Sequence, residues 1–228
     1  MMHSLPRPPK AVIFDMDGLI LDSEILYRKS VISAGEASGL PVGPSIYEGM
    51  LGRPWPGIVT LLKDHFGADF DADAFRSVWL AHFDALIEQE LKLKAGVTDL
   101  LDVLDAHGIP RAICTSSAHG QVQHHLSDFG ILPRFHAIIA QGDYARGKPA
   151  PDPYLTAAAR LGVDPAHCLA LEDSHNGIRS AASAGMMAVM VPDMLPATDE
   201  IAALCAAVID DLHACCRFFP GFALEQSR

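Results

Sequence analysis

Two aspartates near the start of the chain, Asp15 and Asp17, are the residues best placed to do chemistry. They follow the apolar run 11–14, which is too short for a helix and is typical of a fully buried strand. Carboxylates this close repel each other unless a positive group lies between them, and Gly18 allows the chain to turn sharply. The pattern predicts a divalent-cation site at the mouth of an α/β sheet, where ligands of such folds bind. A simpler alternative is an Asp-Gly pair that only starts a turn.

Three later segments also place polar side chains where a predicted strand ends. These side chains are Thr115 and Ser116 after the second strand, Lys148 after the third, and Glu172 with Asp173 after the fourth. The carboxyl ends of parallel strands lie at one edge of a sheet, so these groups can converge although they are far apart in sequence. Taken singly, each has an ordinary structural explanation, either as a helix cap or as a solvated loop lysine.

The chemistry of these groups is complementary. Asp15, Asp17 and Asp173 supply the hard oxygen ligands that Mg²⁺ prefers. Thr115 presents a hydroxyl group just before a predicted helix, a setting that favours an anion, and Lys148 supplies a point charge for a phosphoryl oxygen. Together they match phosphoryl transfer, in which positioning and neutralisation of charge do most of the work.

The elements that must position these residues follow an alternating pattern of short apolar runs and helical segments. The predicted strands are 11–14, 111–115, 137–140, 168–171 and 187–191, with 207–209 as an edge strand. The predicted helices of the same region are 97–106, 120–129, 151–161, 176–184 and 197–206. We therefore expect an α/β fold with a doubly wound, Rossmann-like parallel sheet.

Residues 22–92 differ in character, because they contain helical patterns and no convincing strand. The predicted helices here are 22–38, 56–66 and 71–90. We expect an all-helical insertion at 22–92 within an α/β core made of residues 1–21 and 93–228.

Composition narrows the class of protein. The 228 residues are 50% hydrophobic, enough for a sizeable core, and carry a net charge of −11. A negative net charge does not favour binding to nucleic acid or to an anionic membrane surface. It also repels an anionic substrate, which must therefore be attracted by positive groups within the site. The opening residues read neither as a signal peptide nor as an anchor, and no apolar run approaches the roughly 18 residues of a membrane span. Five cysteines without a C-x-x-C pattern favour a reduced, cytoplasmic protein.

Four segments, DMDG, TSS, GKPAPDPYL and LEDSHNGIRSAASAG, resemble the four motifs of the haloacid dehalogenase superfamily. The resemblance runs from about residue 11 to residue 192 and is closest to the phosphatase and β-phosphoglucomutase-like branch, in which a helical cap domain follows the first motif. It implies that Asp15 is the nucleophile, which forms an aspartyl-phosphate. It also implies that Asp17 is the general acid and base.

The resemblance further implies where a metal and a phosphoryl group bind. Mg²⁺ would be held by Asp15, the main-chain carbonyl of Asp17, and Asp173, with Glu172 as a nearby or water-mediated partner. The phosphoryl group would be held by Thr115, the amide of Ser116, and Lys148. Dehalogenases that attack carbon lack a carboxylate at the position of Asp17, so phosphorus is the expected electrophile.

Two residues of the insertion, Tyr27 and Arg53, are candidates for substrate contacts in the cap. Trp55 could stack on a sugar face or belong to the core of the cap. The β-phosphoglucomutases carry a histidine where this chain has Tyr27, and they have a cap lysine, whereas residues 64–91 contain no lysine here. Both differences favour a phosphatase over a phosphomutase.

The sequence thus predicts a Mg²⁺-dependent phosphomonoester hydrolase that acts on a small phosphorylated metabolite such as a sugar phosphate, as a monomer or weak dimer. A β-phosphoglucomutase-like phosphomutase is the main alternative. A receiver-type signalling module that keeps its aspartyl-phosphate is a third, which Asp17 and the insertion oppose. The apolar tail could dock on the core or form an interface; it contains Cys215, Cys216, Phe218, Phe219 and Phe222.

Overall fold

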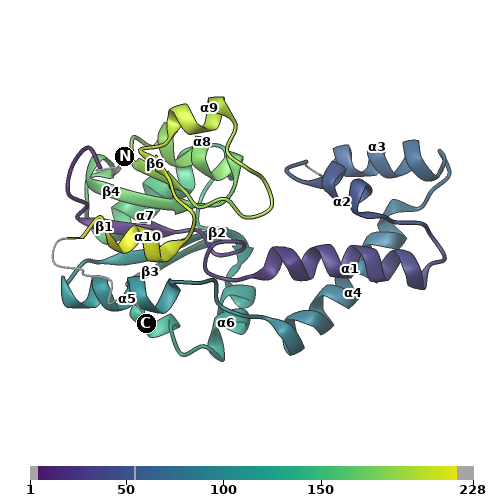
Figure 1. Ribbon diagram of the computed structural model, residues 1–228, viewed down its shortest axis with the longest axis horizontal. Coiled ribbons are helices and arrows are strands. Elements are labelled where there is room, and N and C mark those ends of the chain that lie inside the picture. Colours follow the sequence, from purple (N-terminus) through teal and green to yellow (C-terminus); the bar gives the residue numbers. More distant parts are fainter. Residues whose placement is uncertain (1–4, 54, 220–228) are drawn as a thin grey trace, which may run out of the picture. The chain divides into compact units, whose positions relative to one another are not determined.

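The chain forms two compact units, Met1–Leu21 together with Leu93–Arg228, and Asp22–Lys92. They are seen in a computed structural model that describes residues 5–53 and 55–219 (Figure 1). Among these residues no helix combines the length and the apolar character needed to cross a membrane. The first unit holds a sheet, and the second unit is helical in all of its regular elements that the structure describes.

The first unit is built on a six-stranded sheet in which every neighbouring pair of strands is parallel. Its strands are β1 (Ala11–Phe14), β2 (Arg111–Ala118), β3 (Ala137–Gln141), β4 (Cys168–Glu172), β5 (Met187–Met190) and β6 (Ala207–Val208). Their order is β3-β2-β1-β4-β5-β6, so the chain reverses its direction of progress at β1. This is the doubly wound α/β fold expected from the sequence, and the reversal makes the carboxyl end of β1 the place where a ligand binds in such sheets.

The helices of this unit follow the strands along the chain. They are α5 (Val97–Ala106), α6 (His119–Ser127), α7 (Asp152–Leu161), α8 (His175–Ser183), α9 (Asp199–Leu204) and α10 (Leu212–Cys216), with short 3₁₀ turns at Leu132–Arg134 and Pro165–His167. The predicted elements occur within a few residues of these bounds. Two differences stand out: α10 was not predicted as a helix, and β2, which was expected to end at Thr115, continues to Ala118 with an irregularity in its pairing to β3.

Both faces of the sheet are buried, as its continuous apolar strands require. Ala11 and Ile13 point to one face, where α7, α8 and α9 contribute to the same core cluster. Val12 and Phe14 point to the other face and have no exposed surface. A strand buried on both sides cannot slip in register without burying the polar groups at its end, so β1 holds the residues that follow it in a fixed place.

The second unit consists of α1 (Ser23–Ala37), α2 (Pro44–Met50), α3 (Trp55–Phe66) and α4 (Ala72–Glu90). The sequence predicted three of these helices and missed α2. This helix has seven residues, one of them a glycine, so it is too short to show a helical period. Pro44 at its first position is compatible with a helix start.

The C-terminal residues that the structure describes pack against the rest of the first unit. Cys215 and Cys216 of α10 are fully buried, Phe219 is nearly so, and α10 packs against α5. Phe222 lies outside the described residues. The contact is close at Gly96, whose φ is +84° and where an added Cβ would overlap the main-chain nitrogen of His213.

Replacing Gly96 by alanine should therefore destabilise the protein more than the same change at the other end of α5. The left-handed conformation costs a non-glycine residue about 1–2 kcal/mol, and the overlap with the backbone of α10 should add about 1–3 kcal/mol. Gly108→Ala is the control, because φ is +61° there and an added Cβ meets no atom within 4 Å. Denaturant unfolding measures both variants; equal losses would contradict the close docking of α10.

Candidate active site

Asp15 lies directly after β1, at the centre of the sheet. Its main-chain N–H donates to the carbonyl of Leu171 at 3.0 Å, which continues the pairing of β1 with β4 by one residue. The chain then turns at Gly18, whose φ of +81° favours glycine. Asp15 is 8% exposed, so its carboxylate is withdrawn from bulk water and needs partners within the protein.

Lys148 provides a positive charge between the acidic residues that follow β1 and those at the end of β4. Its Nζ lies 2.5 Å from Oδ1 of Asp15 and 2.6 Å from Oε1 of Glu172. The third contact of Nζ, at 2.9 Å, is the main-chain carbonyl of Cys114 on β2. An ammonium group has three N–H donors, so all three are used. This lysine connects the residue after β1, the middle of β2 and the end of β4.

Glu172 is fully buried at the end of β4 and accepts hydrogen bonds on both of its carboxylate oxygens. Lys148 and the hydroxyl of Tyr154, at 2.8 Å, donate to Oε1. The main-chain N–H and the hydroxyl of Ser174 donate to Oε2, at 3.3 and 3.0 Å. An added Cβ at Gly177, in the first turn of α8, would overlap this carboxylate. Glu172 therefore lies against the N-terminus of α8, where the helix dipole favours a negative charge.

The charges of the site perturb one another. Burial raises the pKa of Asp15 to about 8, Lys148 opposes this shift, and the charge of Glu172 adds to it. Burial acts to lower the pKa of Lys148, but the charges of Asp15 and Glu172 raise it well above its ordinary value. Lys148 thus stays positive at neutral pH. Asp15 needs more positive charge than this lysine supplies if it is to be fully ionised there.

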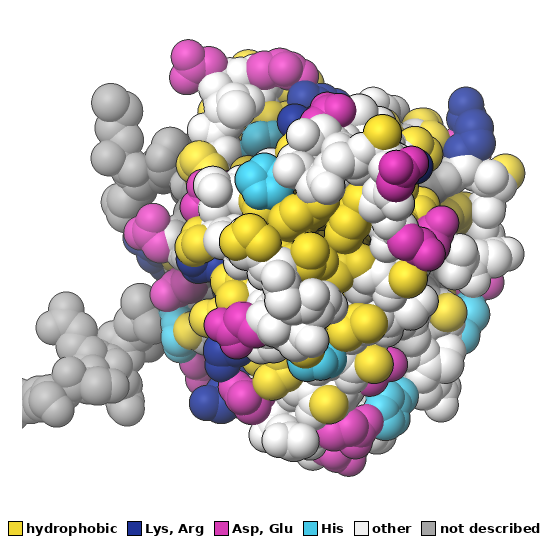
Figure 2. All heavy atoms as spheres, turned by 90° about the vertical axis from the view of Figure 1, so that its right-hand side faces the viewer, with side chains coloured by type: hydrophobic (Ala, Val, Ile, Leu, Met, Phe, Trp, Pro, Cys, Tyr) yellow, Lys and Arg dark blue, Asp and Glu magenta, His cyan; other side chains and the backbone are white. Residues whose placement is uncertain are grey.

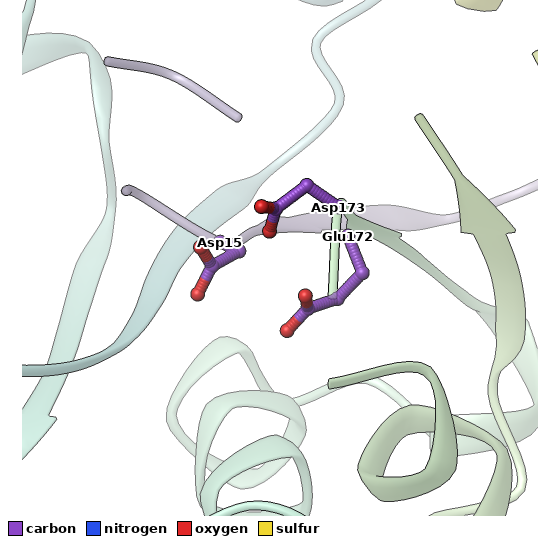
Figure 3. A group of neighbouring side chains, drawn as sticks. All are labelled: Asp15, Glu172 and Asp173. Atoms are coloured by element: carbon purple, nitrogen blue, oxygen red, sulfur yellow. The ribbon is translucent and has the colours of Figure 1, made fainter. Parts of the chain in front are cut away.

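A group of carboxylates offers a place for that charge. Asp15, Glu172 and Asp173 each present an oxygen, and these three oxygens lie within 4.8 Å of one another. Figure 3 shows that the neighbouring side chains of Glu172 and Asp173 leave the chain in opposite directions, with Asp173 beside Asp15. An added Cβ at Gly18 would overlap Oδ2 of Asp173, so this glycine leaves room for the carboxylate. The donor set fits a small divalent cation that prefers oxygen ligands.

Asp17 is oriented by the end of β2. The hydroxyl of Ser117 donates to Oδ2 of Asp17 at 2.8 Å, and the main-chain N–H of Ser117 donates to Oγ1 of Thr115 at 3.0 Å. Asp17 is partly exposed, so its carboxylate is accessible to solvent as well as held by Ser117. A carboxylate in this position can exchange a proton with a bound molecule.

Thr115 and Ser116 lie within β2 and not in a loop before α6, because β2 continues to Ala118. Thr115 is buried and Ser116 is exposed. The hydroxyl of Tyr144, in the loop that leads to Lys148, donates to the carbonyl of Thr115 at 3.2 Å. This contact connects the predicted phosphate-binding residues with the segment that carries the lysine.

The two candidate residues of the helical unit have different surroundings. Arg53 is exposed between α2 and α3, and its main-chain N–H donates to the carbonyl of Met50 at 3.1 Å. Tyr27, on α1, packs edge-on against the rings of Trp79 and Phe83 at centroid distances of 5.5 and 5.4 Å. Burial raises the pKa of Tyr27 to about 12, so its hydroxyl keeps its proton at neutral pH.

Trp55 belongs to the same aromatic packing. Its ring lies 5.8 Å from that of Trp79, and its Nε1 donates to Asp73 at 3.2 Å. The guanidinium of Arg76 lies 4.5 Å above its ring, in cation–π contact. These contacts favour the structural explanation of Trp55 over sugar stacking.

Sequence reasoning assigned no role to three residues that hold the site together, namely Ser117, Tyr154 and Ser174, although each lies in a segment that it singled out. Ser117 and Ser174 stand next to predicted site residues, so their proximity was a signal. Tyr154 lies in the first turn of α7, where a tyrosine is expected to be an ordinary core residue. Only the fold shows that its hydroxyl reaches Glu172.

The predicted metal and phosphate residues thus fall into two groups. The structure brings Asp15, Lys148, Glu172 and Asp173 to one edge of the sheet, and it places Asp17 and Thr115 next to them through Ser117.

Acidic side chains also lie at several separate places on the face that Figure 2 shows, in keeping with the net charge of −11. An anion that approaches this protein therefore depends on the local charge of the site.

Comparison with known proteins finds a family model that covers most of the chain. Residues 9–185 match the family model described as haloacid dehalogenase-like hydrolase. The match includes every strand that contributes to the site, from β1 to β4, together with the helical unit.

Named relatives and a solved structure are similar over most of the chain. A Drosophila melanogaster protein named "Probable pseudouridine-5′-phosphatase" is 33% identical over 201 residues, which is 85% of this chain and 86% of that protein. Hexitol phosphatase B of Escherichia coli K12 is 30% identical over 192 residues, or 83% of this chain and 86% of that protein. A HAD family hydrolase from Deinococcus radiodurans, crystallised with bound phosphate and sodium, has a TM-score of 0.77 and 27% identity, and covers 93% of this chain and 98% of its own.

The packing of Glu172 against α8 predicts that Gly177→Ala impairs the site. The added methyl group must displace the Glu172 carboxylate and with it Lys148, and a misplacement of about 1 Å can cost roughly 10²-fold in rate. Gly120→Ala is the matched control, since Gly120 lies in the first turn of α6 and an added Cβ there meets no atom within 4 Å. Hydrolysis rates of the two variants decide the matter. A Gly177→Ala protein as active as the control would contradict the position assigned to Glu172.

Proposed function

The chain belongs to the haloacid dehalogenase-like hydrolase family, and on this premise we propose that it is a Mg²⁺-dependent phosphatase that forms an aspartyl-phosphate on Asp15. Its substrate is a small phosphorylated metabolite. The observation that carries the proposal is the buried ammonium of Lys148 held between Asp15 and Glu172, at the point where the sheet reverses its order. A site of this kind suits a doubly charged anion that must be brought close to a carboxylate nucleophile.

Two displacements account for the reaction. A carboxylate oxygen of Asp15 attacks the phosphorus, and the bond from phosphorus to the ester oxygen breaks. Asp17 gives a proton to that leaving oxygen, so the alcohol departs neutral. Asp17 then takes a proton from water, whose oxygen attacks the phosphorus of the aspartyl-phosphate. Inorganic phosphate leaves, and Asp15 is restored as a carboxylate.

The surrounding residues hold the charges in place during both displacements. Lys148 lies beside Oδ1 of the Asp15 nucleophile and can shift one N–H donor to a phosphoryl oxygen. Thr115 and the amide of Ser116 supply further donors from β2. Ser117 keeps the Asp17 carboxylate oriented, so that its proton is delivered on the side of the leaving group.

The residues that would hold Mg²⁺ are Asp15, Asp173 and the main-chain carbonyl of Asp17. When bound, the ion neutralises the negative charge of the phosphoryl group and of the carboxylates around it. Glu172 has protein donors on both of its oxygens, so we assign it to Lys148 and, at most, to a water-mediated contact with the ion.

The substrate class rests on the relatives and on the composition of the helical unit. Two relatives are named "Hexitol phosphatase B" and "Probable pseudouridine-5′-phosphatase"; the first name points to a polyol phosphate and the second to a nucleoside phosphate, in which a sugar carries the phosphate. We propose a substrate of that kind for this chain, with Arg53 and Tyr27 as its contacts in the helical unit. A phosphatase is favoured over a phosphomutase because the helical unit lacks a lysine in residues 64–91.

Release of inorganic phosphate from a panel of sugar and polyol phosphates tests this function. Wild type should release phosphate in many turnovers without a bisphosphate activator, and Asp15→Asn should be inactive while it keeps its fold. Asp164→Asn is the matched control, since Asp164 is an exposed aspartate that only caps a 3₁₀ turn, as asparagine can. Isomerised sugar phosphate without free phosphate would instead identify a phosphomutase, and an active Asp15→Asn protein would refute the nucleophile.

Removal of metal supplies a second prediction. EDTA should abolish phosphate release, because the carboxylates at the edge of the sheet then repel the incoming anion. Added Mg²⁺ should restore the original rate. Circular dichroism before and after chelation serves as the control for folding. Full activity in EDTA would contradict the assignment of Asp15 and Asp173 to a metal.

A further inference from the structure

The hydroxyl group of Tyr154 has no part in the two displacements, yet it is buried at the centre of the site. Tyr154 has no exposed surface, and its hydroxyl donates to Oε1 of Glu172 at 2.8 Å. We propose that Tyr154 is a positioning residue for Lys148: its hydroxyl fixes Glu172, and Glu172 in turn holds the lysine ammonium beside Asp15. The inference rests on the proposed function, since it concerns how the phosphoryl-binding lysine is placed.

The geometry at Glu172 makes its first oxygen a shared acceptor. Oε1 receives both Lys148, at 2.6 Å, and Tyr154, at 2.8 Å, whereas Oε2 receives the two donors of Ser174. An ionised carboxylate has about four lone-pair sites, and here each of them faces a donor. The direction in which Glu172 presents Oε1 to Lys148 is therefore set by three contacts from two residues, Tyr154 on α7 and Ser174 at the N-cap of α8.

The position of Lys148 depends on a balance between two carboxylates. Its Nζ is 2.5 Å from Asp15 and 2.6 Å from Glu172, so the two carboxylates hold it at nearly equal distances. A hydrogen bond from Tyr154 spreads part of the negative charge of Glu172 onto the phenol. Without that bond, Glu172 would attract the ammonium more strongly and draw it away from Asp15 and from a phosphoryl oxygen.

The ring of Tyr154 and its hydroxyl act separately, which makes the role testable. The ring packs in the core cluster, and Nζ of Lys148 lies 5.2 Å from its centroid. Phenylalanine keeps the ring and removes only the oxygen. If the hydroxyl only satisfied a buried carboxylate, its removal would lower stability and leave kcat/KM and phosphate affinity unchanged.

Tyr154→Phe in the full-length protein should lower kcat/KM about tenfold, and by the same factor for two chemically different phosphomonoesters. The equal factor follows because Lys148 contacts the phosphoryl group that all substrates share. The affinity for inorganic phosphate, titrated by calorimetry in the presence of Mg²⁺, should fall in parallel. Tyr47→Phe is the matched control, since Tyr47 is also buried and its hydroxyl lies 3.2 Å from a carboxylate oxygen of Glu24 in the helical unit. It should keep both wild-type values, although both variants lose a buried hydroxyl.

A double-mutant cycle separates positioning from general loosening of the core. In the Glu172→Gln background, Tyr154→Phe should cost less than about twofold in kcat/KM, because the group through which it acts has lost its charge. The same tenfold loss in both backgrounds would show that Tyr154 does not act through Glu172.

Two further results would overturn the inference. One is a Tyr154→Phe protein with wild-type kcat/KM and wild-type phosphate affinity. The other is a loss of activity that excess Mg²⁺ restores, since this would place the effect on the metal and not on the lysine. If wild type itself releases no phosphate from any ester, the proposed function fails, and the phosphate titration alone then decides the role of Tyr154.

Discussion

The structure of the site depends on one buried ammonium group. Lys148 lies between Asp15, directly after β1, and Glu172 at the end of β4, and its third donor reaches the backbone of β2. Two carboxylates at neighbouring strand ends would push β1 and β4 apart if nothing lay between them. Because Lys148 binds both carboxylates, it offsets this repulsion and joins the two strands. The remaining negative charge of the carboxylates can still attract a divalent cation.

The order of the strands explains why so few residues suffice. Since β1 lies between β2 and β4, the residues after these three strands meet at one edge, and the segment after β3 needs only a loop to bring in Lys148. The continuous apolar strands fix the register, and the polar residues at their ends are therefore delivered within hydrogen-bond distance. Short helices with close packing complete the arrangement, as at Gly177, where the absence of a side chain lets Glu172 lie under α8.

Most of the strands and most of the site residues could be predicted from the sequence, and the exceptions have physical reasons. Buried parallel strands are short apolar runs, so β1 and β4 and the acidic residues after them were recognisable. The helix α2 was not, because seven residues carry too little pattern. The extension of β2 through Ala118 was missed as well, since Thr115 and its neighbours are polar and resemble a helix cap. Tyr154 was missed because its role lies in a contact across the fold with Glu172, and no local pattern encodes that contact.

The central claim is that the phosphoryl group passes through Asp15. The most direct measurement is rapid acid quenching of a single turnover, followed by digestion and mass spectrometry of the peptides. The account predicts a transient phosphoryl group on the peptide that contains Asp15, formed before free phosphate appears and absent from Asp15→Asn. Release of phosphate in the same turnover with this peptide never modified, or with the phosphoryl group on another residue, would contradict the account.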